Sequence, residues 1–514
     1  MNKPMPAAAK CLAILGTGSD VGKSIAVTAL CRIFCNCGIR TAPYKAQNMS
    51  NNSYVTVEGG EIGRAQAVQA EAARATMHVD MNPVLLKPCT DTGSQVVLLG
   101  KALKSMEASE YFSDRTPLFQ ASVQALNRLR SQYELIVIEG AGSCAEVNLR
   151  KRDFVNFETA HAADAPVILI ADIDRGGVFA QVVGTLEIIP PKDRARVKGI
   201  LINRFRGDLS LFEDGVTYLE ERTGLPVLGV IPHYYHIDID SEDGMPLDTL
   251  LDPAVTPDPR TIRIAVIRLP HISNFTDFNA LIREPSVTLH YLSKPRDLSA
   301  YDALILPGTK NVCFDLEWMR KVGWESEVVR FHQSGRPVTG ICGGYQLLGK
   351  RLHDPLGVEG PPGSSDALGF LDVETEFQST KIVTRTMGRL IGTEMPVSGY
   401  EIHMGVSMLG PEATPFARIT KKNDIVCDNE TDGATDARGQ VFGTYLHGIF
   451  DNAPFRRRFL QGLRSDVDLD AATDAHIRDA QYDLLAEHFA AHMNLDKIFE
   501  ILGIERPRLQ SETE

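Results

Sequence analysis

A glycine-rich loop near the beginning of the chain, LGTGSDVGKS at residues 15–24, constrains the fold more than any other feature. The apolar run CLAIL precedes it and the helical pattern IAVTALCRIF follows it, which is the strand, loop and helix context of a phosphate-binding loop. The usual G-x-x-x-x-G-K-[ST] spacing would place the first glycine at position 17, but Thr17 stands there and the glycine has moved to Gly16. The loop predicts a nucleotide-binding α/β unit, and a glycine-rich turn without a ligand is the alternative.

The amides and side chains of this loop predict how it would bind ATP. Backbone amides between Gly18 and Ser24, Gly22 among them, can surround a phosphate at the helix N-terminus. Lys23 can reach the outer phosphates, and the Ser24 hydroxyl can ligate Mg²⁺. The altered spacing resembles the loop of dethiobiotin synthetase and its relatives, which implies that ATP serves to activate a carboxylate.

Further polar residues stand at the carboxyl ends of predicted strands, where an open α/β sheet places its ligand contacts. Glu139 ends the run LIVIE and resembles the Mg²⁺-binding glutamate of those relatives, with a plain strand-end carboxylate as the alternative. Asn203, in LINRF, occupies the position at which related nucleotide-binding folds read the adenine. Asp172, Asp174 and Arg175 could hold a second metal or orient substrate phosphate and carboxylate groups, or they could lie in a solvated loop.

Short runs rich in Val, Ile and Leu alternate with helical patterns along the first half of the chain. This alternation predicts a P-loop-type, doubly wound parallel α/β domain at residues 1–251. The expected strands are 11–16, 135–140, 167–172, 199–204 and 226–232, and the clearest helical patterns are 25–34 and 61–75.

Three prolines in DPAVTPDPRT predict a linker at residues 252–261. A second α/β domain is expected at residues 262–514, and the helical C-terminal stretch that includes YDLLAEHFAAHMNLDKIFEIL is expected to pack on it. The expected strands of this domain are 263–269, 303–308, 337–342 and 441–448.

The charge, apolar stretches and cysteine content of the chain limit the kinds of binding partner and the cellular compartment to expect. The net charge of -13 argues against nucleic acid, so an anionic nucleotide would depend on local cations and backbone amides. The opening residues MNKPMPAAAK lack an apolar signal-peptide core, and no apolar stretch reaches the length that spans a bilayer. The nine cysteines lack a disulfide-scaffold spacing, which suits a reducing compartment. We expect a cytoplasmic location, no membrane partner and no tightly bound prosthetic group.

A second motif, PVTGICGGYQLLG at residues 337–349, places Cys342 between a strand and a helix. A nucleophile elbow needs this arrangement, because small neighbours permit the strained turn and the helix N-terminus favours the thiolate. The amides of Gly343 and Gly308 are expected to form the oxyanion hole. A buried structural cysteine is the alternative.

His447, in GTYLHGIF, follows another apolar run and is the expected base. With Cys342 it makes the second domain resemble a class I glutamine amidotransferase domain. Many members of that class carry a glutamate two residues after the histidine, but Ile449 stands here, so the third member of the site is unassigned. Such a site would hydrolyse L-glutamine through a thioester and release ammonia. An acyl phosphate formed with ATP at the first site would consume it.

Several segments in both halves extend the resemblance. KAQNMSNNS, MNPVLLKPCTDTGSQVVLLG, DRGGVFA, GYEIHMG and GTYLHGIFDN follow one another in this order, and together they closely resemble the cobyric acid synthase family. The resemblance implies amidation of the b, d, e and g carboxylates of a corrinoid, adenosylcobyrinic acid a,c-diamide, to give adenosylcobyric acid. It also implies that the substrate carboxylate or the γ-phosphate is lined by Lys45, Gln47, Asn48 and Asn51.

Alternatives remain for single residues and for the whole chain. Turn formation is the alternative for the asparagines, and His403 belongs either to a domain interface, to the ammonia entry or to simple packing. Cobyrinic acid a,c-diamide synthase shares both domains, but its family carries a different, aspartate-containing segment after the lysine. A non-catalytic nucleotide switch with a degenerate glutaminase domain is opposed by the intact Cys342 elbow and His447. The oligomeric state is not indicated.

Overall fold

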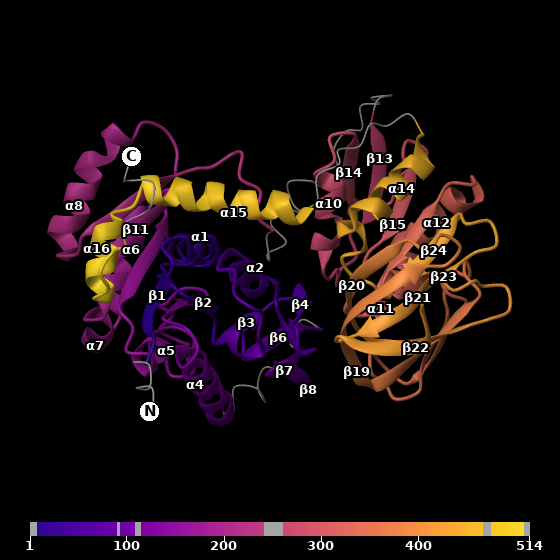
Figure 1. Ribbon diagram of the computed structural model, residues 1–514, viewed down its shortest axis with the longest axis horizontal. Coiled ribbons are helices and arrows are strands. Elements are labelled where there is room, and N and C mark those ends of the chain that lie inside the picture. The colour runs from indigo at the N-terminus through magenta and orange to yellow at the C-terminus, as the bar shows by residue number, and fades with distance from the viewer. Residues whose placement is uncertain (1–7, 90–92, 108–114, 241–260, 466–473, 508–514) are drawn as a thin grey trace, which may run out of the picture.

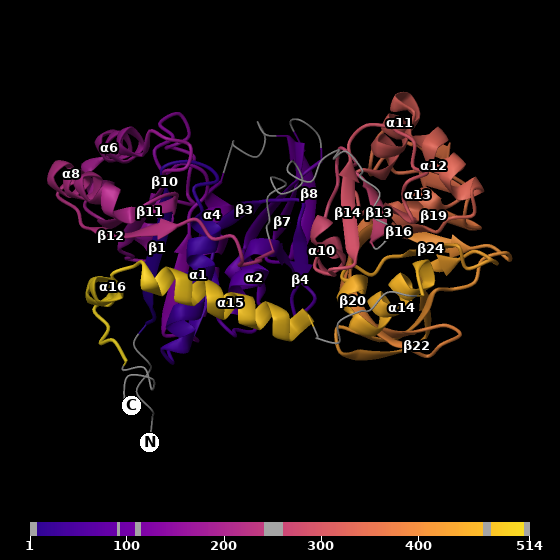
Figure 2. The ribbon, with the colours of Figure 1, turned by 90° about the horizontal axis from the view of Figure 1, so that it is seen from above.

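The computed structural model describes residues 8–89, 93–107, 115–240, 261–465 and 474–507. Two halves of the chain lie side by side, each around its own central sheet (Figures 1 and 2). The expected linker at 252–261 lies outside the described residues except for its last position. Within the described ranges, no helix combines the length and the apolar content that crossing a membrane requires.

The first half is built on a parallel sheet in the order β12-β11-β10-β1-β9-β2. The strand order reverses at β1, so the loops that follow β1, β9 and β10 meet at one edge of the sheet, as at the ligand crevice of other open α/β sheets. Five strands match the predicted runs, and the short β2 was not predicted. The bounds are β1 (Lys10–Gly16), β2 (Thr41–Tyr44), β9 (Leu135–Glu139), β10 (Val167–Asp172), β11 (Val197–Phe205) and β12 (Val227–Pro232).

Helices cover both faces of this sheet because its strands are buried on both sides. In β1, Leu12 and Ile14 face one core, whereas Ala13 and Leu15 face the other. The first core contains α1 (Lys23–Asn36), α15 (Asp474–Ala491) and α16 (Leu495–Leu502). The second contains α4 (Thr116–Arg130), α5 (Phe157–Ala162), α6 (Val178–Ile188) and α8 (Glu213–Thr223), with α7 (Pro191–Arg194) beside it.

Small elements between β2 and α4 carry the segment that begins at Lys45. The helical pattern expected from residue 61 begins only at Arg64, because the three residues before it form β5 and pair with β4. The bounds are β3 (Gln47–Met49), β4 (Ser53–Val55), β5 (Glu61–Gly63), α2 (Arg64–Ala72), η1 (Val79–Met81), β6 (Val84–Pro88), β7 (Gly93–Leu98) and β8 (Lys101–Glu107). The strands β3-β6-β7-β8 form a second sheet.

The second half contains a sheet in the order β14-β13-β15-β16-β24-β23, in which only the pair β24 and β23 is antiparallel. Its strands are β13 (Ile262–Ile267), β14 (Val287–Leu292), β15 (Ala303–Leu306), β16 (Val338–Ile341), β23 (Ala434–Thr435) and β24 (Val441–Thr444). Around it lie η3 (Phe275–Phe278), α10 (Asn279–Ile282), α11 (Val312–Val322), α12 (Trp324–Gln333), α13 (Gly343–Leu348), η4 (Ile449–Asp451) and α14 (Ala453–Leu463).

A further, mostly antiparallel sheet, which the sequence pattern did not predict, covers the second half. Its longest strands, β19 and β20, pair with one another over most of their length. The strands are β17 (Arg351–Asp354), β18 (Gly363–Asp366), β19 (Val373–Leu390), β20 (Pro396–Leu409), β21 (Ala417–Lys422) and β22 (Ile425–Asp432).

The expectation that the C-terminal helices pack on the second half is wrong. α15 lies along α1 of the first half, where Leu485 and Phe489 join the core of β1 (Figures 1 and 2). Beyond α15, Met493 pairs with Gly229 of β12, and Phe499 of α16 packs its ring edge against Phe34. Helical periodicity shows that a helix has an apolar face, but it does not show which sheet receives that face.

Candidate functional site

The phosphate-binding loop connects β1 to α1 through a tight turn. Gly22 has a φ of 96°, a left-handed conformation that favours glycine, directly before the first residue of α1. A Cβ on Gly16 would lie 2.9 Å from both the Gly18 carbonyl oxygen and Lys23 Nζ. The displaced glycine is therefore needed because the loop folds closely over its own lysine.

Lys23 is held inside the loop by backbone oxygens. Its Nζ donates to the carbonyl of Gly18 at 2.8 Å and to that of Gly142 at 2.9 Å. Burial lowers the pKa of Lys23 to about 8, although the nearby Glu139 carboxylate opposes this shift. Phosphate oxygens could replace these carbonyls as acceptors, and their negative charge would favour the protonated lysine.

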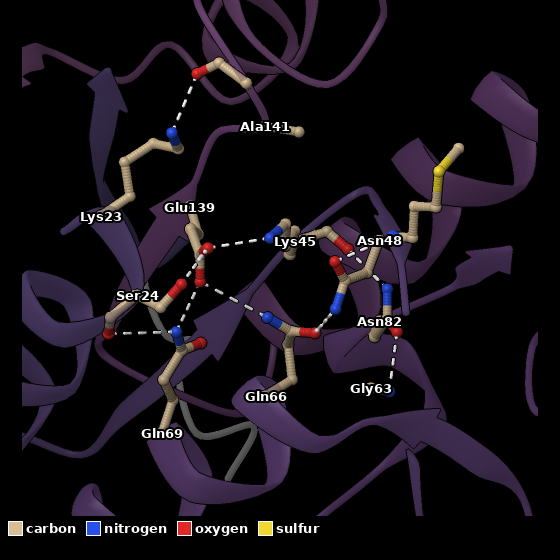
Figure 3. A network of polar contacts seen from close by, with 12 residues as sticks. Lys23, Ser24, Lys45, Asn48, Gly63, Gln66, Gln69, Asn82, Glu139 and Ala141 are labelled. Carbon is tan, nitrogen blue, oxygen red and sulfur yellow. Dashed lines mark hydrogen bonds and ion pairs between the residues drawn. The ribbon is translucent and has the colours of Figure 1, made fainter. Parts of the chain in front are cut away.

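Glu139, at the end of β9, is the centre of a buried polar cluster (Figure 3). Its Oε1 accepts hydrogen bonds from Ser24 Oγ and Lys45 Nζ, both at 2.8 Å. Its Oε2 accepts from Gln69 Nε2 at 2.5 Å and from Gln66 Nε2 at 3.4 Å. Burial alone would raise the pKa of Glu139, but the Lys45 ammonium and these hydrogen bonds hold it below its ordinary value. The ionised carboxylate thus joins the loop, the Lys45 segment and α2.

The sequence analysis did not identify Gln66 and Gln69. Both are fully buried on α2, and their spacing of three residues places them on one face of the helix. Polar residues at this spacing in an alanine-rich helix are the signal that could have identified them.

The donor set of this cluster fits Mg²⁺. Ser24 Oγ and Glu139 Oε1 are hard oxygen atoms 2.8 Å apart at the mouth of the loop. Mg²⁺ is commonly held in proteins by one or two carboxylates together with substrate phosphates and water. The part of the chain that the structure describes contains no group of three or more His, Cys, Asp or Glu residues that could hold a metal ion, so a metal here would depend on the Ser24 hydroxyl and on ligands from the nucleotide and water.

The segment after Lys45 contributes unequally to the cluster. Asn48 Nδ2 donates to Gln66 Oε1 at 3.0 Å, so this asparagine contacts the cluster directly. Gln47 Oε1 instead accepts from Arg115 at 3.0 Å. The Oδ1 atom of Asn51 is buried and has no hydrogen-bond partner among the described residues. The structure therefore connects Asn48 to Glu139 through Gln66 and places Gln47 on a separate contact.

Asn203 and Thr17 make hydrogen bonds at the border of the phosphate-binding loop. Asn203 Nδ2 donates to the Val21 carbonyl at 3.0 Å, and its buried Oδ1 has no partner in the described part of the chain. On another edge, Thr17 Oγ1 donates to Gln181 Oε1 of α6 at 3.3 Å. Asn203 thus contacts the loop with one end and offers an acceptor with the other.

The acidic turn after β10 is occupied by ion pairs. Asp172 Oδ2 lies 2.8 Å from Arg204 Nη1, and Asp174 Oδ1 lies 2.5 Å from Arg206 Nε. Arg175 is exposed in the same turn. These ion pairs weigh against a second metal site. Asp174 is also exposed, as in a solvated loop, whereas Asp172 is buried.

The second site is built around a strained turn. Cys342 lies between β16 and α13 with φ 52° and ψ -108°, and its side chain is buried. A left-handed conformation at a non-glycine residue is uncommon and typical of nucleophile elbows. A Cβ on Gly344 would lie 2.0 Å from the Leu306 carbonyl oxygen, and one on Gly343 would lie 2.7 Å from Thr309. Both glycines are required because the elbow packs against the turn after β15.

His447 is buried beside this elbow and has a carboxylate behind it. Its Nδ1 lies 2.7 Å from Asp277 Oδ2, and the other carboxylate oxygen accepts from the Gly448 amide at 2.9 Å. Burial opposes protonation, but the Asp277 and Cys342 charges and hydrogen bonds to both raise the pKa of His447 to about 10. A Cβ on Gly308 would lie 3.1 Å from His447 Cε1, so the expected oxyanion turn borders the same site.

Asp277 supplies the member of the site that was unassigned from the sequence. It lies in η3, far in the sequence from Ile449, the position that carries a glutamate in many members of the class. The surrounding SNFTDFNA carries no pattern that marks a catalytic acid. His403 has a different role, since its Nδ1 lies 2.7 Å from the Gly405 carbonyl and its ring stacks on Tyr445 at 3.7 Å. That environment agrees with the packing alternative.

Family models match both halves of the chain. The CobQ/CobB/MinD/ParA nucleotide binding domain matches residues 12–247, and the CobB/CobQ-like glutamine amidotransferase domain matches residues 263–455. Together with the two parallel sheets, these matches confirm the expected fold class.

Three relatives that match nearly the whole chain are cobyric acid synthases. The cobyric acid synthase of Chlorobaculum tepidum is 56% identical over 493 residues, which cover 96% of this chain and 98% of that protein. Cobyric acid synthases of Chlorobium phaeobacteroides and Photorhabdus laumondii are 54% and 48% identical, again over 96% of this chain and over 99% and 98% of their own lengths. The chain is accordingly a glutamine-dependent ligase. It belongs to the cobyric acid synthase family.

Proposed function

We propose that this chain uses ATP and L-glutamine to amidate the b, d, e and g carboxylates of adenosylcobyrinic acid a,c-diamide, giving adenosylcobyric acid in cobalamin biosynthesis. The family membership supports the substrate class, and the two polar sites supply residues for the two half-reactions. The observation that carries the proposal is the pair of hydrogen bonds that bring Ser24 and Lys45 to one oxygen of Glu139. These hydrogen bonds connect the phosphate-binding loop to the segment after Lys45, which distinguishes this family from cobyrinic acid a,c-diamide synthase.

At the glutaminase site, the Cys342 thiolate attacks the side-chain carbonyl of glutamine and forms a thioester. The protonated His447 donates its proton to the departing ammonia, and Asp277 keeps the ring oriented and stabilises its charge. The amides of Gly343 and Gly308 donate hydrogen bonds to the developing oxyanion. Water then attacks the thioester, His447 takes its proton, and glutamate leaves.

At the synthase site, Lys23 binds the outer phosphates of ATP and Lys45 neutralises charge that develops during phosphoryl transfer. Ser24 and Glu139 would hold Mg²⁺, which would supply positive charge that neutralises the phosphate oxygens of ATP. A substrate carboxylate attacks the γ-phosphorus, and ADP leaves. Ammonia attacks the resulting acyl phosphate, so that the amide forms and phosphate departs.

Further contacts complete the proposed site. Asn203 Oδ1, which lacks a partner among the described residues, would accept a hydrogen bond from the adenine amino group. The loop that contains Gly16, Thr17, Gly18 and Gly22 would surround the phosphates, and its amides between Gly18 and Ser24 would donate to them.

Four polar side chains would line the substrate carboxylate or the γ-phosphate. They come from the segment after Lys45 and from the turn after β10, and are Gln47, Asn48, Asn51 and Arg175.

We propose residues 1–251 as the ATP-binding unit and 262–514 as the glutaminase unit, with α15 and α16 docked on the ATP-binding unit. A cytoplasmic location is also part of the proposal, and cell fractionation with an antibody against the chain tests it.

An assay of the purified protein with ATP, Mg²⁺ and glutamine against two corrinoids tests the function. We expect amide formation on adenosylcobyrinic acid a,c-diamide and none on cobyrinic acid. Turnover of cobyrinic acid alone would instead assign the chain to a,c-diamide synthesis. No turnover of either corrinoid, with ATP bound, would favour a nucleotide switch.

A further inference from the structure

The turn that carries Asp277 is bonded to the other half of the molecule. In η3, the backbone amide of Phe275 donates to Asn52 Oδ1 at 3.2 Å. One residue earlier, Asn274 Oδ1 accepts from the backbone amide of Ser53 at 2.9 Å. All of these residues are buried. Two hydrogen bonds therefore connect residues 52 and 53 to the short turn that sets the position of the Asp277 carboxylate.

The same two residues are connected to the synthase site. The Asn52 carbonyl accepts from the amide of Arg64, the first residue of α2, at 3.0 Å. Two and five residues further along this helix, Gln66 and Gln69 hold Glu139 Oε2. A continuous line of contacts thus runs from the Glu139 carboxylate through α2 to Asn52.

A second connection runs along the chain itself. Lys45, which contacts Glu139 Oε1, lies seven positions before Asn52 in the printed sequence. Between them β3 pairs with β6, and the amide of Ser50 donates to the Leu86 carbonyl at 3.0 Å. Residues 47–50, between Lys45 and Asn52, are held by strand hydrogen bonds. A displacement of Lys45 would therefore displace Asn52 as well, which a flexible loop between them would prevent.

We propose that Asn52 and Asn274 are positioning residues of the glutaminase, through which occupancy of the synthase site sets the orientation of Asp277 and His447. The inference rests on the proposed function, because it takes ATP and the corrinoid as ligands of the synthase site. Ligands that contact Lys45 or Glu139 would shift the segment and α2, and the two hydrogen bonds would carry that shift to η3. Glutamine hydrolysis would then be fast only when an acceptor for ammonia is present.

The conformation of Asn274 makes a clean test possible. Asn274 has a φ of 51°, which glycine adopts readily and asparagine and aspartate tolerate. Asn274→Gly keeps the backbone conformation and removes the acceptor for Ser53, whereas Asn274→Asp keeps an acceptor oxygen. The pair of variants separates loss of the hydrogen bond from strain in the turn.

The experiment measures glutamine hydrolysis with and without ATP, Mg²⁺ and adenosylcobyrinic acid a,c-diamide. Couplings between two sites are commonly worth about 5- to 150-fold, and we expect stimulation in this range for the wild-type chain. Asn274→Gly should lose most of the stimulation through kcat, with the KM for glutamine unchanged and with ammonia-dependent amidation retained. Asn274→Asp should recover the stimulation.

Asp238→Asn is the matched control. Its carboxylate lies 2.5 Å from Arg283 Nε and connects the two halves at an exposed position, whereas Asn52 and Asn274 are buried. We expect this variant to keep the wild-type stimulation. If it loses the stimulation as Asn274→Gly does, the coupling depends on domain contact in general and the proposal fails.

Other outcomes would also overturn the proposal. They are wild-type stimulation in Asn274→Gly, equal loss of ammonia-dependent amidation in that variant, and absence of stimulation in the wild-type chain. If the wild-type chain forms no amide from ammonia, the proposed function itself fails, and this result is distinguishable because it does not involve the variants.

Discussion

Asp277 Oδ2 lies 2.7 Å from His447 Nδ1, although 170 positions separate the two residues in the chain. The contact gives the proposed glutaminase site a Cys-His-Asp arrangement in place of the glutamate that many members of the class carry two residues after the histidine. The other oxygen of Asp277 accepts from the Gly448 amide, so the carboxylate is fixed at both ends. The arrangement leaves Nε2 of His447 to serve Cys342.

Asp277→Asn should lower the kcat of glutamine hydrolysis by about 100-fold or more, because the amide keeps the shape but not the charge that orients and stabilises the imidazolium. Ammonia-dependent amidation should not change. The pKa of His447 is raised to about 10 against the effect of burial, and the negative charge of Asp277 is a main cause, so its removal should lower that pKa. The alkaline limb of the glutaminase pH profile should therefore move to lower pH. An unmoved limb with full kcat would contradict the role of Asp277.

Cys342→Ala should abolish glutamine-dependent amidation and leave ammonia-dependent amidation intact, since only the thioester step needs the thiol. Product formation with each nitrogen donor is the measurement. Cys313→Ala, at a half-buried thiol in α11, is the control and should retain both activities. Equal loss of both activities in Cys342→Ala would argue against separate sites.

Lys23→Ala should abolish amidation with either nitrogen donor, because the lysine is expected to bind the phosphates of ATP in both reactions. ATP binding measured by calorimetry should weaken in parallel. Basal glutamine hydrolysis without ATP should persist, which shows that the variant is folded. Amidation at the wild-type rate would remove the loop from the ATP site.

Glu139→Gln should raise the Mg²⁺ concentration needed for half-maximal amidation by about 10-fold or more, because it removes the carboxylate proposed to bind the metal. The amide can still accept hydrogen bonds from Ser24 and Lys45. A Mg²⁺ titration at saturating ATP is the measurement. An unchanged requirement would leave Glu139 as a plain strand-end carboxylate.

Glu61→Gln should destabilise the protein by about 3–5 kcal/mol, because it leaves buried lysines without their counter-charge. Glu61 is fully buried, 2.7 Å from Lys87 Nζ and 2.6 Å from Lys381 Nζ. Burial alone would raise the pKa of Glu61, but these two ammonium groups hold it far below its ordinary value. Its contribution to stability is therefore present above the ordinary pKa and lost as the pH falls below it.

Urea denaturation at neutral pH measures the effect of Glu61→Gln. Glu134→Gln is the control, since its partner Arg40 is largely exposed and such pairs are worth about 0–1 kcal/mol. Similar small effects in both variants would show that the buried ion pairs of Glu61 add little to the free energy of unfolding.

Much of the scaffold could be predicted from local pattern. The strand, loop and helix around Lys23, the elbow around Cys342 and the main parallel strands depend on residues close together in the sequence. Glycine spacing and continuous apolar runs report such local conformations directly. Short or polar elements such as β2 and the long antiparallel strands of the second half lack that signal.

The sequence by itself therefore determined the positions of the phosphate-binding loop and of the Cys342 elbow, their order in the chain and the family to which the chain belongs. Only the tertiary structure decided which distant residues complete each site. Asp277 reaches His447, Gln69 reaches Glu139, and α15 packs on α1 because the sheets and their connections bring these segments together. The sequence around an aspartate or a glutamine does not indicate which distant residue it contacts. Its hydrogen-bond partner is known only when the chain is folded.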